Sequence, residues 1–262
     1  MDDREVGRMW DENADAWTLL SRAGYNVYRD ELLTPAFLAM LPDVDGLRGL
    51  DIGCGEGHNT RLVSKRGARM TGIDIAPRFI SHATEEESAQ PLGIRYLVGS
   101  GSALPLANDS FDFAVAFMSL HDMGDPQNAL HEAYRVLRPG GFLQFSITHP
   151  CFSTPRLSWI HDESGRRVAR ACGDYFAEQR GHVSEWLFSF APPEAKAGLR
   201  RFRVPLFRRT LSHWLNSVAD AGFVVERTEE PYADDEAVRK RPRLADTRIV
   251  ANFLLIRCRK HR

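Results

Sequence analysis

The sequence predicts an α/β fold in which a seven-stranded, mostly parallel sheet is sandwiched by helices. Two observations predict it. Short apolar runs with strand character alternate with helical patterns from residue 47 to residue 147, and the alternation resumes after residue 210. The chain of 262 residues, 43% of them hydrophobic, is also long enough to bury one large core that carries a sizeable insertion.

The amino-terminal region, residues 1–45, is expected to form a helical cap. Trp10 and Trp17 lie at helical spacing, and a second helix is expected from Tyr28 to Leu41. Pro42 ends that helix, because proline lacks a backbone donor and clashes with the preceding turn.

Residues 46–148 are expected to form a cofactor-binding core with five strands. The order of strand, helix and strand places the carboxyl ends of parallel strands along one edge of the sheet, where ligands bind in such folds. The expected strands are Leu47–Ile52, Met70–Ile75, Ile94–Val98, Phe111–Phe117 and Phe142–Ile147, and the expected helices are Asn59–Arg66, Arg78–Glu86 and Pro126–Leu137.

The alternation breaks in residues 149–209, which are irregular, rich in arginine and aromatic residues, and interrupted by prolines. A long segment inserted late in an α/β unit is commonly a lid, so we expect a substrate lid. The alternative is an inserted segment that only stabilises the fold. Residues 210–262 are expected to complete the core with a helix, a strand at Phe223–Thr228 and a last strand at Ile249–Ile256.

Charge and cysteine usage exclude several classes of protein. The net charge of -1 gives no global attraction to nucleic acid or to an anionic membrane. No signal peptide or membrane-spanning apolar run is evident, so we expect a soluble, cytoplasmic protein, monomeric or homodimeric, without nucleic-acid or membrane partners. The four cysteines form no CxxC pair and no zinc-like cluster, so no metal site is expected.

The stretch GLDIGCGEGHNTRL, Gly49 to Leu62, follows the first strand and opens a helix. Glycines allow close approach of a ligand to the backbone, and a helix start offers free N–H groups. Asp51 ends the first strand and Asp74 ends the second, where a carboxylate can accept two hydrogen bonds from a ribose diol. Asp74 could instead only cap the next helix.

The glycine spacing distinguishes two kinds of cofactor. A dinucleotide-binding loop has the pattern G-x-G-x-x-G, whereas Gly53, Gly55 and Gly57 are one residue tighter and enclose Glu56. Negative charge beside a pyrophosphate is unfavourable, but Asp51 and Glu56 suit a cofactor with an ammonium or sulfonium charge. A cationic, ribose-bearing cofactor is therefore expected.

Four segments occur in a familiar order: LDIGCGEGHNT, GIDIA, GSALPLANDSFDFAVAFMSLHDM and RVLRPGGFLQFS. This part of the chain, Leu47 to Ser146, resembles the class I S-adenosylmethionine-dependent methyltransferases, in particular their type 11 small-molecule group. The resemblance resumes weakly in RRTLSHWLNSVADAGFVVERTEEP. It implies a Rossmann-like fold, S-adenosylmethionine as cofactor with S-adenosylhomocysteine as product, and methyl transfer to an O, N or C atom of a small-molecule acceptor.

The resemblance also implies roles for individual positions. Asp51 would lie near the cofactor's ammonium group, Asp74 would hold the ribose hydroxyls, and Ile75 would pack on the adenine. Many relatives carry an aspartate that accepts from the adenine amino group where this chain has Ser100, whose hydroxyl can accept one hydrogen bond. Ile75 and Met118 could instead be core residues. The set implied to bind the cofactor is Asp51, Gly53, Gly55, Asp74, Ile75, Gly101, Ser102, Ala103, Phe117 and Met118.

The acceptor site requires mainly alignment, because a sulfonium methyl group is already activated. A base is needed only if the acceptor must lose a proton, and His121 and His149 are the candidates because both follow strand ends; the alternative for each is a structural histidine. The excess of basic residues in the insertion could receive an anionic acceptor or form a solvated face. The residues expected to line the acceptor pocket, with core packing as the alternative for the tryptophans, are Trp10, Trp17, Tyr25, Tyr28 and Trp186.

Other functions remain open on the sequence alone. The chain could methylate RNA or protein, or bind the cofactor without catalysis. The loop after the fourth strand reads SLHDM rather than the Asn/Asp-Pro-Pro-aromatic motif that methylates base or glutamine amino groups, which argues against that branch. The glycine spacing disfavours a nicotinamide-dependent reductase.

Overall fold

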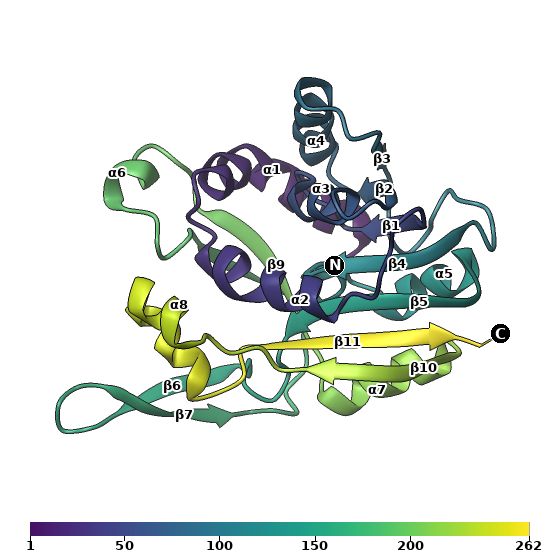
Figure 1. Cartoon of the computed structure of the whole chain (residues 1–262). Helices are drawn as coiled ribbons and strands as arrows, with labels where there is room; N and C mark the ends of the chain where they lie inside the picture. Colours follow the sequence, from purple (N-terminus) through teal and green to yellow (C-terminus); the bar gives the residue numbers. More distant parts are fainter. Residues whose placement is uncertain (262) are drawn as a thin grey trace.

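A seven-stranded sheet forms the centre of the computed structural model, which describes residues 1–261 (Figure 1). The strand order is β10-β11-β5-β4-β1-β2-β3, in which β1 to β5 pair in parallel and β11 is antiparallel to both of its neighbours. The predicted fold class is confirmed. The strands are β1 Arg48–Ile52, β2 Arg69–Asp74, β3 Arg95–Val98, β4 Phe111–Phe117, β5 Leu137–Thr148, β10 Phe223–Glu229 and β11 Phe253–Lys260.

Helices cover both faces of this sheet and contribute apolar side chains to two buried clusters. On one face Leu130 and Trp214, from α5 and α7, belong to the same buried cluster as Phe145. On the other face Phe37 of α2 and Val63 of α3 are buried in a cluster with Phe113. The α-helices of the core and cap are α1 Asp3–Arg22, α2 Thr34–Met40, α3 His58–Ser64, α4 Pro77–Ala89, α5 Pro126–Val136 and α7 Leu211–Asp220.

The second amino-terminal helix differs from the prediction. It is divided into a π-helical turn, η1 (Arg29–Leu33), and α2, so it is not one continuous α-helix. Thr34 N–H reaches back to the carbonyl of Arg29, and Pro35, which follows, has no N–H to continue an α-helical ladder. The proline therefore explains why the α-helical pattern is interrupted here.

The carboxyl-terminal strand also begins later than predicted, at Phe253 rather than Ile249. Residues before it form α8 (Asp235–Lys240) and the 3-10 helix η3 (Pro242–Arg248). Leu244 of η3 is buried with Val27, a residue that lies more than two hundred positions earlier. This long-range contact stabilises a helical turn that the local sequence pattern did not predict.

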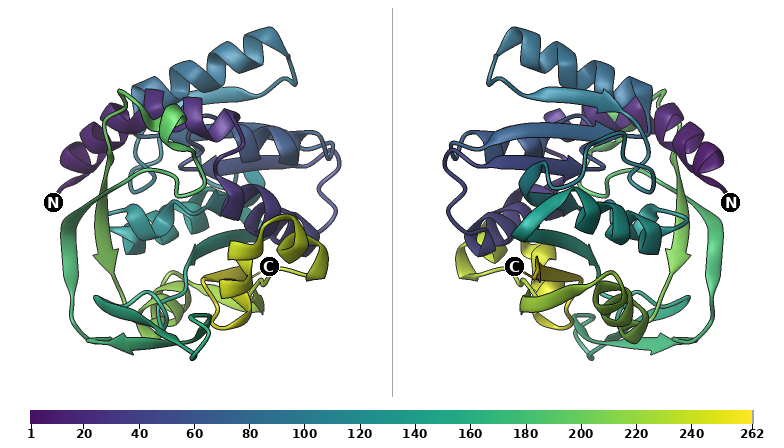
Figure 2. Two further views of the ribbon diagram at one scale, coloured as in Figure 1. Left: turned by 90° about the vertical axis from the view of Figure 1, so that its left-hand side faces the viewer. Right: turned by 90° about the vertical axis from the view of Figure 1, so that its right-hand side faces the viewer.

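The insertion consists of two antiparallel hairpins. The first pairs β6 (Arg156–His161) with β7 (Arg167–Gly173), and the second pairs β8 (Gln179–Trp186) with β9 (Phe202–Arg208), with α6 (Pro193–Lys196) in its connection. Figure 2 shows the β8–β9 hairpin beside α1. The side-chain amide of Asn13 in α1 both donates to the carbonyl of Arg203 and accepts from its N–H, each at 2.9 Å.

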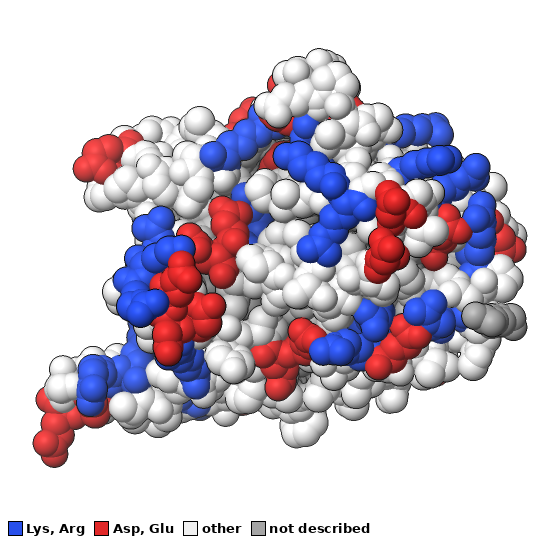
Figure 3. Space-filling view, viewed as in Figure 1, with Lys and Arg blue, Asp and Glu red and all other residues white. Residues whose placement is uncertain are grey.

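The surface carries interspersed charges of both signs on the face drawn in Figure 3. None of the helices within residues 1–261 has the length and apolar character needed to cross a bilayer.

Candidate active site

A cavity of about 680 Å³ opens at the carboxyl edge of the parallel strands. Most of its wall comes from four parts of the chain: the amino-terminal helices, the loops after β1 to β3, the segment after β4, and the insertion. Trp214 of α7 and Phe253 of β11 also line it. The loops after the strands are the predicted cofactor region, and the amino-terminal helices and the insertion contribute the predicted aromatic residues.

The three glycines after β1 serve different purposes. All have positive φ angles, 76° at Gly53, 55° at Gly55 and 83° at Gly57. A Cβ atom at Gly57 would lie 2.5 Å from the Tyr96 hydroxyl, and one at Gly53 would clash with Ser119. At Gly55 a Cβ atom would meet no atom of residues 1–261 within 4 Å. Gly53 and Gly57 thus permit close packing within the protein, whereas Gly55 leaves open space in the cavity wall.

Asp51 is the buried acid at the end of β1, with 1% of its surface exposed. Thr60 Oγ1 donates to its Oδ2 at 2.6 Å, while its Oδ1 has no partner among residues 1–261. Burial raises the pKa of Asp51 to about 7, although the Thr60 hydrogen bond acts in the opposite direction. An unsatisfied carboxylate oxygen in a cavity wall fits a cationic ligand group such as an ammonium.

Asp74 holds the glycine loop in place from the end of β2. Its Oδ2 accepts from Gly55 N–H at 2.8 Å, and its Oδ1 accepts from Ala76 N–H, at the start of α4, at 2.9 Å. Burial raises the pKa of Asp74 to about 6, opposed by these backbone hydrogen bonds. Each carboxylate oxygen can accept a further hydrogen bond, so this local role leaves capacity for a ligand's hydroxyl groups.

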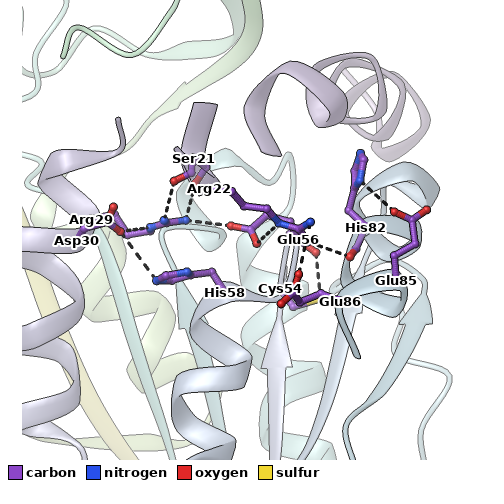
Figure 4. Close-up of polar contacts among 11 residues, drawn as sticks. Ser21, Arg22, Arg29, Asp30, Cys54, Glu56, His58, His82, Glu85 and Glu86 are labelled. Carbon is purple, nitrogen blue, oxygen red and sulfur yellow. Dashed lines mark hydrogen bonds and ion pairs between the residues drawn. The ribbon is translucent and has the colours of Figure 1, made fainter. Parts of the chain in front are cut away.

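Glu56 does not offer a free negative charge to a ligand, contrary to the electrostatic expectation from the sequence. Its carboxylate lies 3.0 Å from Arg29 Nη1 and 4.0 Å from Arg22 Nε (Figure 4). Arg29 also donates to Ser21 Oγ and to Asp30 Oδ1, each at 2.6 Å. The network attaches the glycine loop to the amino-terminal cap, and Asp51 therefore carries the argument for a cationic ligand.

The predicted adenine edge is only partly in the cavity wall. Ile75, Gly101 and Ser102 line the cavity, but Ala103 does not. Ser100 also lines it, and its hydroxyl group donates to Asp3 of α1 at 2.6 Å. No local sequence pattern points to Asp3, because its partner Ser100 lies 97 positions away.

The end of β4 presents the predicted pair Phe117 and Met118 to the cavity. Phe117 packs on Phe37 with ring centroids 3.8 Å apart. Met118 has a φ of 53°, an unfavourable conformation for a side chain of this size, and its N–H donates to Ser146 Oγ at 3.0 Å. Strained backbone of this kind is often found at functional sites.

His121 lines the cavity, directly after β4, in the 3-10 helix η2 (Leu120–Asp122). Burial, together with the nearby charge of Arg209, lowers the pKa of His121 to about 4, so the imidazole is neutral at pH 7. Its Nδ1 has no partner within residues 1–261, and its Nε2 lies 3.5 Å from Asp122 Oδ1. Burial raises the pKa of Asp122 well above its ordinary value.

His149, the other candidate base, is buried but does not line the cavity. Its Nε2 lies 2.7 Å from Glu230 Oε1, and its Nδ1 accepts from Cys151 N–H at 3.2 Å. Thr148 and Pro150 on either side do line the cavity. Because successive side chains of an extended segment alternate in direction, His149 points away from the cavity.

The predicted aromatic residues Trp10, Trp17, Tyr25, Tyr28 and Trp186 all line the cavity. Trp17 also packs against the second hairpin of the insertion, with ring centroids 5.7 Å from Trp186. Trp17 and Trp186 therefore serve both as cavity wall and as packing between α1 and the insertion.

Two basic residues of the insertion also line the cavity. Arg208 donates from Nε to Gln179 Oε1 at 2.6 Å, and no carboxylate lies within ion-pair distance of it among residues 1–261. Arg209 donates to the carbonyls of Met123 and Gly124, each at 2.9 Å, and burial lowers its pKa to about 10. The excess of basic residues was evident in the sequence, but not which of them face the cavity.

Comparisons with known proteins agree with this site. A family model described as "Methyltransferase domain" matches residues 50–145. A malonyl-[acyl-carrier protein] O-methyltransferase of Pectobacterium atrosepticum is 35% identical over 134 residues, 51% of this chain and 51% of that protein. A demethylmenaquinone methyltransferase of Tropheryma whipplei is 32% identical over 147 residues, 56% of this chain and 60% of that protein. The chain thus spans between half and two thirds of the length of these curated relatives.

A solved structure matches over a larger part of the chain. It is an S-adenosylmethionine-dependent methyltransferase from Mesorhizobium loti, 32% identical, with a TM-score of 0.70 over 86% of this chain and 96% of that chain. The open space at Gly55 and the oxygen of Asp51 that has no partner among residues 1–261 fit S-adenosylmethionine, the cofactor of that enzyme. The chain therefore belongs to the S-adenosylmethionine-dependent methyltransferases.

Proposed function

We propose that this protein transfers a methyl group from S-adenosylmethionine to an O, N or C atom of a small molecule. The observation that carries the proposal is the single cavity that joins the glycine loop after β1 to a chamber lined with aromatic residues. The cofactor supplies an activated methyl group, and the chain has to hold its acceptor in line with that group and exclude water.

Three groups of the chain are proposed to hold the cofactor. The free Oδ1 of Asp51 would accept from the ammonium group, and Asp74 would accept from the ribose hydroxyls. Arg29, which lines the cavity and whose charge is paired with Glu56 and Asp30, would donate a hydrogen bond from its guanidinium to the cofactor's carboxylate. These contacts match each charged or hydroxyl group of the methionine and ribose parts with a group of opposite character.

The acceptor is proposed to have an apolar or aromatic body and an acidic group. Trp17, Tyr28 and Trp186 offer flat apolar surfaces in the cavity wall. An acidic group is proposed because the guanidinium of Arg208 lines the same cavity and no carboxylate within residues 1–261 neutralises it. In this arrangement the insertion, residues 149–209, acts as a lid that supplies the specificity.

His121 is proposed to position the acceptor. A neutral imidazole whose Nδ1 is unpartnered can accept a hydrogen bond from an acceptor O–H or N–H and so orient the lone pair that attacks. A histidine with a pKa of about 4 is a weak base, so alignment rather than proton removal is its main contribution.

Two measurements test this function. Calorimetry should detect binding of both S-adenosylmethionine and S-adenosylhomocysteine to the folded protein, and the absence of binding to either would contradict the proposal. Methyl transfer itself is tested by incubating the protein and S-adenosylmethionine with small organic acids and following S-adenosylhomocysteine. If the product never exceeds its level without acceptor, the chain binds the cofactor without catalysis on that class of compound.

A further inference from the structure

A carboxylate from the start of the chain lies at the predicted adenine edge of the cavity. Asp3, in the first turn of α1, lines the same cavity as Ser100 and Ser102. The hydroxyl of Ser100 donates to Asp3 Oδ2 at 2.6 Å, and the hydroxyl of Ser102 donates to the same oxygen at 2.5 Å. Two hydrogen bonds to one oxygen hold the carboxylate in a defined orientation.

The second oxygen of this carboxylate is available to a ligand. Within residues 1–261 both hydrogen bonds to the Asp3 side chain end on Oδ2, and no basic side chain forms an ion pair with it. Oδ1 therefore retains its full capacity to accept hydrogen bonds. A charged acceptor at a cavity wall favours a ligand group that carries N–H or O–H donors.

The first turns of α1 also lie directly over Ile75. A Cβ atom added at Gly7 would be only 3.0 Å from Ile75 Cγ1, so the helix packs closely on this side chain. Ile75 is the residue that the family resemblance assigns to the adenine face. Asp3 is therefore placed beside the adenine position rather than beside the methionine end of the site.

We propose that Asp3 accepts a hydrogen bond from the adenine amino group of S-adenosylmethionine and sets the selectivity for that base. The amino group of adenine donates hydrogen bonds at the edge of the base, and a carboxylate oxygen can accept one of them. Asp3 would thus replace the aspartate that many relatives carry at the position of Ser100, while Ser100 and Ser102 orient it. The inference rests on the proposed cofactor site and assigns a residue outside the matched domain, residues 50–145.

Helix α1 connects the cofactor end of the cavity with its acceptor end. Asp3, Trp10 and Trp17 belong to one helix of 20 residues, and all three line the cavity. A contact between Asp3 and the cofactor would therefore also hold the helix that presents both tryptophans to the acceptor.

The test compares two ligands that differ only at the base. Calorimetry is performed with S-adenosylhomocysteine and with S-inosylhomocysteine, in which an oxygen acceptor replaces the amino group. The wild-type protein should bind the inosyl compound about 5- to 150-fold more weakly, as expected for the loss of one well-placed contact to a base edge. In Asp3→Asn the side-chain amide can donate to that oxygen, so the ratio of the two affinities should fall to about one or invert.

Two further variants separate base recognition from an effect on folding. Glu12→Gln is the matched control on the same helix, because Glu12 does not line the cavity and its nearest basic partner, Arg203, is 3.9 Å away; it should keep the wild-type ratio. The double variant Ser100→Ala, Ser102→Ala leaves the start of the helix intact and should lower the ratio by releasing Asp3.

The outcomes distinguish this inference from the proposed function. If the wild-type protein binds both ligands equally, or if Asp3→Asn keeps the wild-type ratio, the role of Asp3 is wrong while the methyltransferase proposal stands. If the folded wild-type protein binds neither ligand, both proposals are overturned.

Discussion

The hydroxyl of Thr60 binds one oxygen of Asp51 at 2.6 Å and leaves the other oxygen buried without a partner among residues 1–261. A buried, unsatisfied carboxylate oxygen is costly in a ligand-free protein. The cost is removed when a ligand brings a donor to that oxygen, so this pair of residues prepares the site for a cationic group.

Replacing Asp51 by asparagine should therefore weaken cofactor binding with little change in shape. We expect the affinity for S-adenosylhomocysteine to fall about 10- to 150-fold, because a hydrogen bond to a charged group contributes about 1.5–3 kcal/mol. Calorimetry measures the change, and Asp220→Asn, at an exposed acid, is the control. An Asp51→Asn protein with wild-type affinity would remove Asp51 from the cofactor site.

Cofactor binding should also depend on pH through Asp51. Its pKa is raised to about 7, so the carboxyl becomes ionised, and able to attract an ammonium group, as the pH rises through about 7. Affinity for S-adenosylhomocysteine should increase over that interval and then level off. Asp51→Asn should flatten the dependence, and an equally steep profile in the variant would assign it to another group.

The same shift predicts an opposite trend for the stability of the ligand-free protein. Because the folded state holds the Asp51 proton more tightly than the unfolded state, the contribution of this group to stability falls as the pH rises from the ordinary carboxyl range towards about 7. Thermal melts of the wild-type protein and Asp51→Asn over this interval measure the contribution, which should be absent from the variant.

The two glycines Gly55 and Gly57 should respond differently to alanine. Both substitutions incur about 1–2 kcal/mol for a left-handed backbone, but only at Gly57 does the new Cβ atom meet a neighbour, 2.5 Å from the Tyr96 hydroxyl. Gly57→Ala should therefore lower the melting temperature more. Gly55→Ala should mainly lower cofactor affinity, since its Cβ atom enters open space; equal melting temperatures would contradict this division.

His121 should titrate far below its ordinary range. With a folded-state pKa of about 4, its contribution to stability is present above the unfolded-state pKa, about 6.5, and is lost as the pH falls from there towards about 4. Proton NMR of the imidazole should show no titration between about pH 5 and 8. His121→Gln, which removes the titration, should reduce the loss of stability in acid, whereas a midpoint near 6.5 would contradict the assigned burial.

Arg208 should determine the preference for an acidic acceptor. With S-adenosylhomocysteine bound, tryptophan fluorescence should report tighter binding of aromatic acids than of the corresponding amides. Arg208→Gln should abolish most of that preference, and Arg201→Gln, at an exposed position of the same insertion, should retain it. An unchanged preference in Arg208→Gln would assign the acidic group to another residue.

Several features of this protein were determined by its sequence alone. The seven strands were predictable because apolar periodicity and turn residues act over a few positions, and β4 matches its expected range, Phe111–Phe117. The same holds for Asp51 and Asp74, because an acid at the carboxyl end of a parallel strand has to lie near the ligand-binding edge. The resemblance to the methyltransferases rested on this ordered part of the chain.

Tertiary structure decided what those local patterns could not. The partner of Glu56 is Arg29, which neutralises it, and the partners of Ser100 and Ser102 include Asp3, 97 and 99 positions away. Only the packed fold showed that His149 faces Glu230 while His121 faces the cavity. A side chain's charge state and direction depend on groups brought together by folding, and no local sequence signal encodes those distances.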